Sequence, residues 1–270
     1  MTTLLKINFS ALILLTASLL SSRADSISGS FSNDCTSLVK LWDFSGTYTS
    51  TNSDQTETET VVLNMDATGN ITGTGHFDVN DNANAEFLHT DVTVVGKVSG
   101  GGSATRIKLT FVGNSGTGQV QGQNVTFQLK LNDSFELDES SRTLLGKSSG
   151  NIKISVPSLG ITRSKSIPSS QAMENLPHVV DGAWGLSQTT APTGTKYNGA
   201  SILTLSNGKQ FNLVMTGTYS SKTDLSKISL KSTDKTAPIS LSLVEKNLGS
   251  TLSILSLKGK ALGQSLQFKQ

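Results

Sequence analysis

The chain reads Arg106-Ile107-Lys108-Leu109-Thr110-Phe111 near its middle, with an apolar side chain at every second position. Side chains of a β-strand point alternately to its two faces, so this stretch predicts a strand with one apolar face. Antiparallel sheets with one wet face produce such alternation, whereas parallel sheets give longer apolar runs. We therefore expect an all-β, antiparallel fold. The same alternation recurs after Leu41, at residues 127–131, 152–156, 228–230, 239–243 and 266–268.

Turn-forming residues separate the predicted strands. Asn207-Gly208 lies between the alternating stretches 202–205 and 211–215, and Asn-Gly accepts the positive φ angles of a tight hairpin. Thr68-Gly69-Asn70 predicts a similar turn after 61–65, and Gly113–Gly118 and Gly122 predict two more. Strands at this spacing are typical of sandwiches and barrels. The one helix candidate is the short stretch 170–176.

The sequence also contains an internal similarity. Gly96 and the stretch 106–109 match Gly217 and the stretch 227–230, both with an offset of 121 residues, and Gly146-Lys147 matches Gly259-Lys260. Trp42 and Trp184 stand near the start of the two halves. Repeats of this kind predict two related β units, each a small up-and-down barrel or a sandwich.

The expected boundaries follow from this division. Residues 1–24 are expected to be a signal peptide, 25–40 a flexible lead-in, 41–156 the first β unit and 181–270 the second. Residues 157–180 are expected to be a linker, because they hold three of the five prolines and proline cannot donate to a strand ladder.

A three-residue resemblance bears on the choice between barrel and sandwich. Gly182-Ala183-Trp184 resembles the Gly-x-Trp that opens the first strand of lipocalin-type and avidin-type barrels. The first half departs from it, since Lys40 stands where the glycine belongs. The resemblance implies a barrel rather than a sandwich, and it assigns no family.

The N-terminus predicts export. An almost wholly apolar run at 9–20 follows Lys6 and precedes Ser22-Arg23-Ala24, which predicts cleavage before Asp25. The run is shorter than the roughly 20 residues of a membrane-spanning helix, so no transmembrane span is expected in the processed chain. We expect a secreted protein, or one of the periplasm or cell envelope.

Charge and cysteine content narrow the class further. The chain after residue 24 has 20 basic and 20 acidic residues, and a neutral protein has no overall field to attract nucleic acid. Residues 25–150 nevertheless carry a net charge of −8 and residues 151–270 one of +8. This asymmetry indicates either docking or divergence of the halves, or a polyanionic partner for the second half. The single cysteine, Cys35, excludes an intrachain disulfide and is expected to be an incidental thiol in the lead-in.

Few residues point to catalysis. The three histidines, His76, His89 and His178, have no metal-ligand spacing, and neither a Gly-x-Ser-x-Gly elbow nor a phosphate loop is present in the sequence. The acids around residue 136 are either a pair for glycosidic cleavage or surface charge that prevents aggregation. These acids are Asp133, Glu136, Asp138 and Glu139.

A possible calcium loop is the most distinctive polar feature. Oxygen-bearing side chains alternate through residues 78–86, and Ca²⁺ prefers six to eight oxygen ligands. The stretch departs from a helix–loop–helix site, because Ala83 stands where glycine is needed and His89 where the bidentate glutamate belongs. The alternative is a solvated turn. The candidate ligands are Asp78, Asn80, Asn82, Asn84 and Glu86.

Three functions remain open from the sequence. The preferred one is a non-catalytic binding module for a small apolar or lipid-like ligand, or for a surface partner, because one-faced strands can enclose an apolar interior. The second is a structural or interaction protein of the envelope or matrix without a ligand pocket. The third is a hydrolase whose catalytic residues are dispersed along the chain.

Overall fold

The structure, a computed structural model, describes residues 29–51, 53–140, 143–175, 184–193, 196–247 and 252–270. Within these ranges the chain forms strands and two 3₁₀ turns, η1 (Gly102–Ala104) and η2 (Pro157–Leu159), and no α-helix. No helix in the described part of the chain is long and apolar enough to cross a membrane. The expected all-β fold is confirmed. The expected signal peptide and the Gly182-Ala183 pair lie outside the described residues.

The first sheet has eight antiparallel strands in sequence order. Its two outer strands, β2 and β9, are not paired with each other in the described ranges, so the sheet is curled but open. The strands are β2 (Gly46–Thr51), β3 (Glu57–Met65), β4 (Asn70–Asp81), β5 (Glu86–Ser99), β6 (Arg106–Val120), β7 (Gln123–Asp138), β8 (Thr143–Val156) and β9 (Ile161–Asn175).

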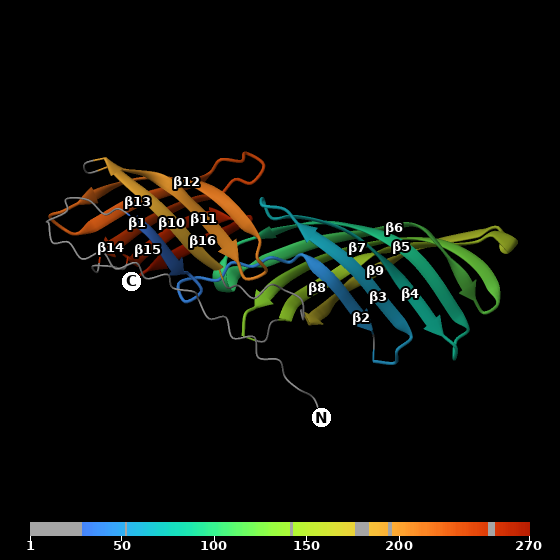
Figure 1. Ribbon diagram of the computed structural model, residues 1–270. Coiled ribbons are helices and arrows are strands. Elements are labelled where there is room, and N and C mark those ends of the chain that lie inside the picture. The colour runs from blue at the N-terminus through green and yellow to red at the C-terminus, as the bar shows by residue number, and fades with distance from the viewer. Residues whose placement is uncertain (1–28, 52, 141–142, 176–183, 194–195, 248–251) are drawn as a thin grey trace, which may run out of the picture.

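The second sheet also has eight antiparallel strands, and its first strand comes from the N-terminal end of the chain. Strand β1 pairs with β10, so the chain enters this sheet, crosses to build the first sheet, and returns. Figure 1 shows the two curled sheets end to end. The strands are β1 (Gly29–Asp34), β10 (Trp184–Thr193), β11 (Lys196–Leu205), β12 (Gln210–Ser220), β13 (Leu225–Ser232), β14 (Ser240–Asn247), β15 (Leu252–Ala261) and β16 (Gln264–Lys269).

The boundaries differ from the sequence expectation in two places. The lead-in expected at 25–40 contains β1, which completes the second sheet. The linker expected at 157–180 contains β9, and Pro168 lies where the register with β8 shifts between Ser148 and Gly150. A proline is tolerated there because β9 is an edge strand and a bulge does not need its N–H group. The helix considered at 170–176 is likewise strand up to Asn175.

Three of the predicted turns are present and the fourth is a bulge. Gly208, Gly69 and Gly122 have φ angles of 84°, 80° and 75°, at the turns that join β11 to β12, β3 to β4 and β6 to β7. The stretch Gly113–Gly118 is no turn, because β6 runs through it with a register shift between Gly113 and Gly116. The glycine residues of this stretch do mark an irregularity, because glycine inside a strand often indicates a bulge.

Glycines on the inner face allow the first sheet to curl. A Cβ atom at Gly75 would lie 2.2 Å from the Thr60 carbonyl oxygen, and one at Gly146 would lie 2.0 Å from the Ser134 oxygen. Neighbouring backbones can approach this closely only where no side chain intervenes, which is how glycine kinks introduce curvature into a sheet.

The repeated segments occupy equivalent strands. Gly96 lies on the fourth strand of the first sheet, β5, and Gly217 on the fourth strand of the second, β12. Gly146 and Gly259 likewise lie on the seventh strands, β8 and β15. The two units are therefore related in strand order. The tryptophans are not equivalent, since Trp184 begins a second strand whereas Trp42 precedes a first.

One hydrophobic core runs through both units, because Cys35, Leu41, Trp42 and Phe44 of the crossing segment 35–45 are buried members of it. Trp42 and Phe44 are 2 % and 1 % exposed. Glycine turns meet at the junction, where a Cβ atom at Gly69 would lie 2.7 Å from the Leu262 carbonyl oxygen. The Ser265 N–H also donates to the Gly100 carbonyl across the junction.

Candidate functional site

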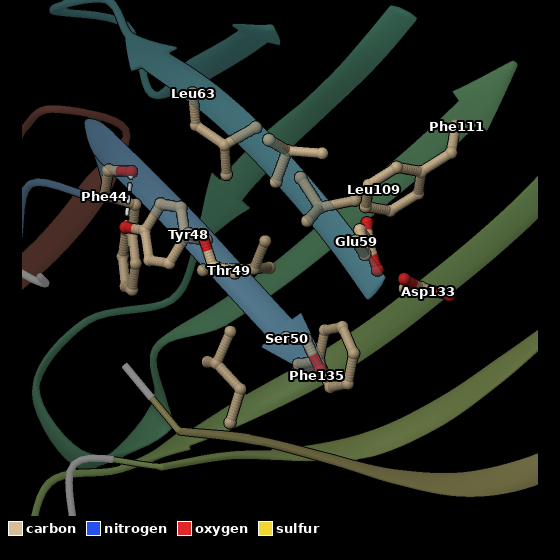
Figure 2. Close-up of a pocket in the computed structure, with 13 residues that line it drawn as sticks. Phe44, Tyr48, Thr49, Ser50, Glu59, Leu63, Leu109, Phe111, Asp133 and Phe135 are labelled. Carbon is tan, nitrogen blue, oxygen red and sulfur yellow. Dashed lines mark hydrogen bonds between the residues drawn. The ribbon is translucent and has the colours of Figure 1, made fainter. Parts of the chain in front are cut away.

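The curled first sheet encloses a cavity of about 70 Å³ that is partly open to solvent. Figure 2 shows the lining side chains, which come from strands that are distant in the sheet order, β2 and β3 on one side and β6 to β8 on the other. The lining is formed by Phe44, Tyr48, Thr49, Ser50, Glu59, Val61, Leu63, Ile107, Leu109, Phe111, Asp133, Phe135 and Leu144.

Strand alternation explains why most of this lining is apolar. Val61 and Leu63 point inward from β3, and Ile107 and Leu109 point inward from β6. Their neighbours on the same strands face solvent, as Val62 does with 52 % exposure. The cavity is thus the unfilled part of the face that the sequence predicts to be buried.

Two acids interrupt the apolar lining. Glu59 continues the inward row of Val61 and Leu63 on β3, and Asp133 continues the inward row of Phe135 on β7. Strands β3 and β7 are not neighbours in the sheet, and Figure 2 shows the two carboxylates pointing toward one another across the cavity. Sequence alternation predicts the orientation of each acid, but only the curl brings them together.

The environment of Asp133 favours its neutral form. Burial raises the pKa of the Asp133 carboxyl, and a hydrogen bond from Ser148 offsets only part of this effect. Its Oδ1 atom is buried and has no hydrogen-bond partner among the described residues. A buried carboxyl oxygen without a partner is costly, so a donor that entered the cavity would be stabilised here.

Tyr48 forms the other polar part of the wall. Its hydroxyl donates a hydrogen bond of 2.7 Å to the Phe44 carbonyl oxygen, which holds the ring against the cavity (Figure 2). Burial raises the pKa of the Tyr48 hydroxyl, with a further contribution from the nearby Asp43 carboxylate. The phenol is therefore neutral at physiological pH.

The four acids considered from the sequence do not form one site. Glu136 accepts hydrogen bonds from Arg106 on the outer face of the first sheet, at 2.8 Å. Asp138 shares the face of Glu136, as the alternation predicts, whereas Asp133 points into the cavity. Glu139 follows the end of β7. The partner that faces Asp133 in the cavity, Glu59, was not considered from the sequence.

The predicted calcium ligands lie at the hairpin between β4 and β5. Asp78 and Asn80 are on β4, Glu86 begins β5, and Asn82 and Asn84 are in the turn between them. The turn is organised by Asp81, whose carboxylate accepts hydrogen bonds from the backbone N–H groups of residues 83 and 84. Calcium binding stays a prediction for this hairpin.

Two histidines meet beside this hairpin on the outer face. His89 Nδ1 lies 2.6 Å from Asp78 Oδ1, and His76 Nε2 lies 3.6 Å from Asp78 Oδ2. The hydrogen bond with Asp78 raises the pKa of His89. Within the described ranges, no group of three or more His, Cys, Asp or Glu side chains is arranged to hold a metal ion. His178 lies outside the described residues.

A second buried polar cluster lies inside the second sheet. Gln188, Ser201 and Glu245 are 0 %, 1 % and 0 % exposed. Gln188 Nε2 donates to Glu245 Oε1 at 2.8 Å, while Gln188 Oε1, Ser201 Oγ and Glu245 Oε2 have no hydrogen-bond partner among the described residues. The sequence contains the signal, because Leu241 and Leu243 place Glu245 on the apolar face of β14.

Cys35 is buried rather than free in a loose lead-in. Its side chain is 0 % exposed at the junction of the two units. Burial raises the pKa of the thiol to about 12, with smaller contributions from Asp34 and Glu245. A buried, protonated thiol is an inert packing group.

Comparison with known proteins adds no relative. The chain matches no family model, no curated protein and no solved structure.

Proposed function

We propose that this protein is a binding module that holds a small apolar or amphiphilic molecule in the cavity of the first sheet. The observation that carries the proposal is an apolar cavity, enclosed by a curled sheet, with a small number of polar groups in its wall. Ligand sites in proteins commonly have this composition, a mostly apolar wall with a few polar groups that fix the orientation of the ligand.

The proposal is tested with an uncharged hydrophobic dye, N-phenyl-1-naphthylamine, titrated into the purified protein. Its fluorescence is expected to rise to saturation at a stoichiometry of one, and lauryl alcohol is expected to displace it. Absence of saturable dye binding would contradict the proposal and favour a structural protein without a ligand pocket.

A hydrolase is the second candidate, favoured by the two carboxylates that converge in the cavity. Pairs of acids, one with a raised pKa, carry out glycosidic cleavage. The walls beside these acids are largely Leu, Ile and Phe, which offer few hydrogen-bond partners for sugar hydroxyls. Hydrolysis of nitrophenyl glycosides that is lost in Asp133→Asn would establish this alternative.

We also propose that the protein acts outside the cytoplasm, as a secreted or cell-envelope protein. The apolar run at 9–20 and the cleavage pattern before Asp25 support this. N-terminal sequencing of the protein recovered from the medium or envelope fraction is expected to begin at Asp25. A mature chain that begins at Met1 in the cytosol would contradict it.

A further inference from the structure

The outer face of the second sheet carries a concentrated positive charge. Strands β13 to β16 are neighbours in the sheet, and they contain six lysines and one acid. The acid, Glu245, is 0 % exposed inside the sheet, whereas all six lysines are exposed. The lysines are scattered singly along the sequence, and the order of the strands gathers them on one face. They are Lys227, Lys231, Lys246, Lys258, Lys260 and Lys269.

The register of the strands places five of these lysines in three successive outward-facing rows. Lys227 and Lys269 lie in one row across β13 to β16, Lys258 lies in the next, and Lys231 and Lys260 lie in the third. Residues two positions apart on a strand are separated by roughly 7 Å. The positive charges therefore repeat along the face at about this interval, which is an arrangement suited to a polymer with repeated negative groups.

These lysines have no counter-charge in the protein. Among the described residues, none of the six forms an ion pair. Charges of one sign that are held close together repel each other and reduce stability. An anionic partner on this face would remove the repulsion and gain charge-assisted hydrogen bonds from the ammonium groups.

A polar groove crosses the face. It has a volume of about 400 Å³, is partly open to solvent, and is lined by Lys227, Lys258 and Lys269. The groove also presents hydroxyl and amide groups, which can donate and accept hydrogen bonds. These groups belong to the outward-facing side chains of Ser242, Ser256 and Gln267.

We infer that the outer face of β13 to β16 binds an acidic polysaccharide, whose carboxylate or sulfate groups pair with the lysines and whose hydroxyl groups bind the serine and glutamine side chains. The inference does not depend on the proposed function, because the cavity lies in the first sheet. The composition of the face favours this partner over a nucleic acid. The four strands contain no arginine, the residue best suited to bidentate phosphate contacts, and their one aromatic residue, Phe268, packs against the core and is not free to stack on bases.

Three polymers test the inference with the purified protein. Fluorescently labelled alginate, a linear polysaccharide with a carboxylate on every sugar, is compared by anisotropy with uncharged dextran and with an oligothymidylate that has the same number of negative charges. We expect saturable binding of alginate, no binding of dextran and weaker binding of the oligonucleotide. Because the contacts are between exposed charges, the affinity for alginate is expected to fall at least about tenfold between about 50 and 200 mM salt.

Three results would overturn the inference. These are failure to bind alginate at low salt, equal binding of alginate and dextran, and binding of the oligonucleotide or of phosphatidylglycerol vesicles at least as tight as that of alginate. The last result would assign the face to a nucleic acid or to a membrane surface instead.

Variants separate this face from the charge of the whole molecule. The lysines of the groove are changed together, as Lys227→Gln, Lys258→Gln and Lys269→Gln. The control removes three exposed lysines from the outer face of the first sheet, as Lys97→Gln, Lys130→Gln and Lys153→Gln. The groove variant is expected to bind alginate at least about tenfold more weakly than wild type, and the control less than about twofold. Equal losses would show that net charge and not this face binds the polymer, and circular dichroism confirms that both variants are folded.

Discussion

Gln188 and Glu245 are joined by a hydrogen bond of 2.8 Å across the interior of the second sheet, although their strands, β10 and β14, are not neighbours in it. The bond shows that this sheet is curled strongly enough for side chains of its second and sixth strands to contact each other across its interior. Burial raises the pKa of Glu245, and the hydrogen bond from Gln188 only partly opposes this.

This buried carboxyl makes stability depend on pH. A folded-state pKa above the ordinary value means that the folded chain binds the proton more tightly than the unfolded chain. The stabilisation is complete below about pH 4.5 and is lost as the pH rises through the raised pKa of Glu245. We expect the free energy of unfolding to fall over this window, by at most about 1.4 kcal/mol per pH unit for this group.

Urea unfolding of wild type and Glu245→Gln at a series of pH values measures the effect. The variant cannot ionise, so its dependence on pH is expected to be shallower by the contribution of Glu245. The pH dependence that remains in the variant includes the contribution of Asp133, whose pKa is also raised by burial. Parallel curves for the two proteins would show that Glu245 does not titrate in this window.

Lys209 stabilises a buried acid at the junction of the units. Its Nζ lies 3.2 Å from Asp43 Oδ2 and donates to the Met65 carbonyl oxygen at 3.0 Å. Burial alone would raise the pKa of Asp43, but hydrogen bonds from Ser45 and the charge of Lys209 outweigh it and lower the pKa. Lys209→Met would leave the fully buried Asp43 without its cation.

We expect Lys209→Met to reduce the free energy of unfolding by about 2 kcal/mol at pH 7, less than for a fully buried pair because Lys209 is partly exposed. The stabilisation by the Asp43–Lys209 pair is present above the ordinary pKa of Asp43 and is lost as the pH falls through the lowered pKa of Asp43. The stability of the variant should therefore approach that of wild type in strong acid. Lys227→Met, at an exposed position of β13, is the control in the same urea titrations. Equal losses in both variants would contradict a specific role for Lys209.

Gln264 holds the crossing segment to the second sheet. Its Oε1 accepts from the Trp42 N–H at 3.0 Å, and its Nε2 donates to the Trp42 carbonyl oxygen at 2.6 Å. Gln264→Leu would leave two buried backbone groups unpaired, and we expect a loss of about 2 kcal/mol in thermal or urea unfolding. Gln267→Leu is the control, because Gln267 is exposed on the same strand. A loss below 0.5 kcal/mol, roughly the lower limit for one hydrogen bond, would show that the two hydrogen bonds between Gln264 and the Trp42 backbone do not stabilise the fold.

The local sequence pattern was sufficient to predict the strands, but it was not sufficient to predict which strands pair with each other. Alternation along the chain predicts the inward direction of Ile107 and Leu109, and Asn207-Gly208 predicts its hairpin. The insertion of β1 beside β10 depends on a pairing between residues 29–34 and 185–190, which no local signal records. The prolines of 157–180 led to the prediction of a linker. A proline is tolerated in an edge strand, but that β9 is an edge strand is known only once the order of the strands in the sheet is known.

The candidate site was hidden for the same reason. Asp133 was considered among the acids of its own segment, but the structure places it opposite Glu59, 74 positions earlier in the chain. Glu59 and Glu245 share one signal that sequence analysis can use, an acid in phase with an apolar row. In each case the neighbours two positions away, Val61 and Leu243, are buried.

Filling the cavity tests whether its space is needed for binding. Val61 lines the cavity with 5 % exposure, whereas the adjacent Val62 is 52 % exposed on the opposite face of β3. Val61→Phe adds volume inside the cavity, and we expect at least a tenfold weaker affinity for the dye, with a stability change within roughly the 1–3 kcal/mol of overpacked cores. Val62→Phe makes the same chemical change toward solvent and is expected to bind the dye like wild type. Equal dye affinity in both variants would place the bound molecule elsewhere, because a ring at position 61 and a ligand in the cavity would have to occupy the same space.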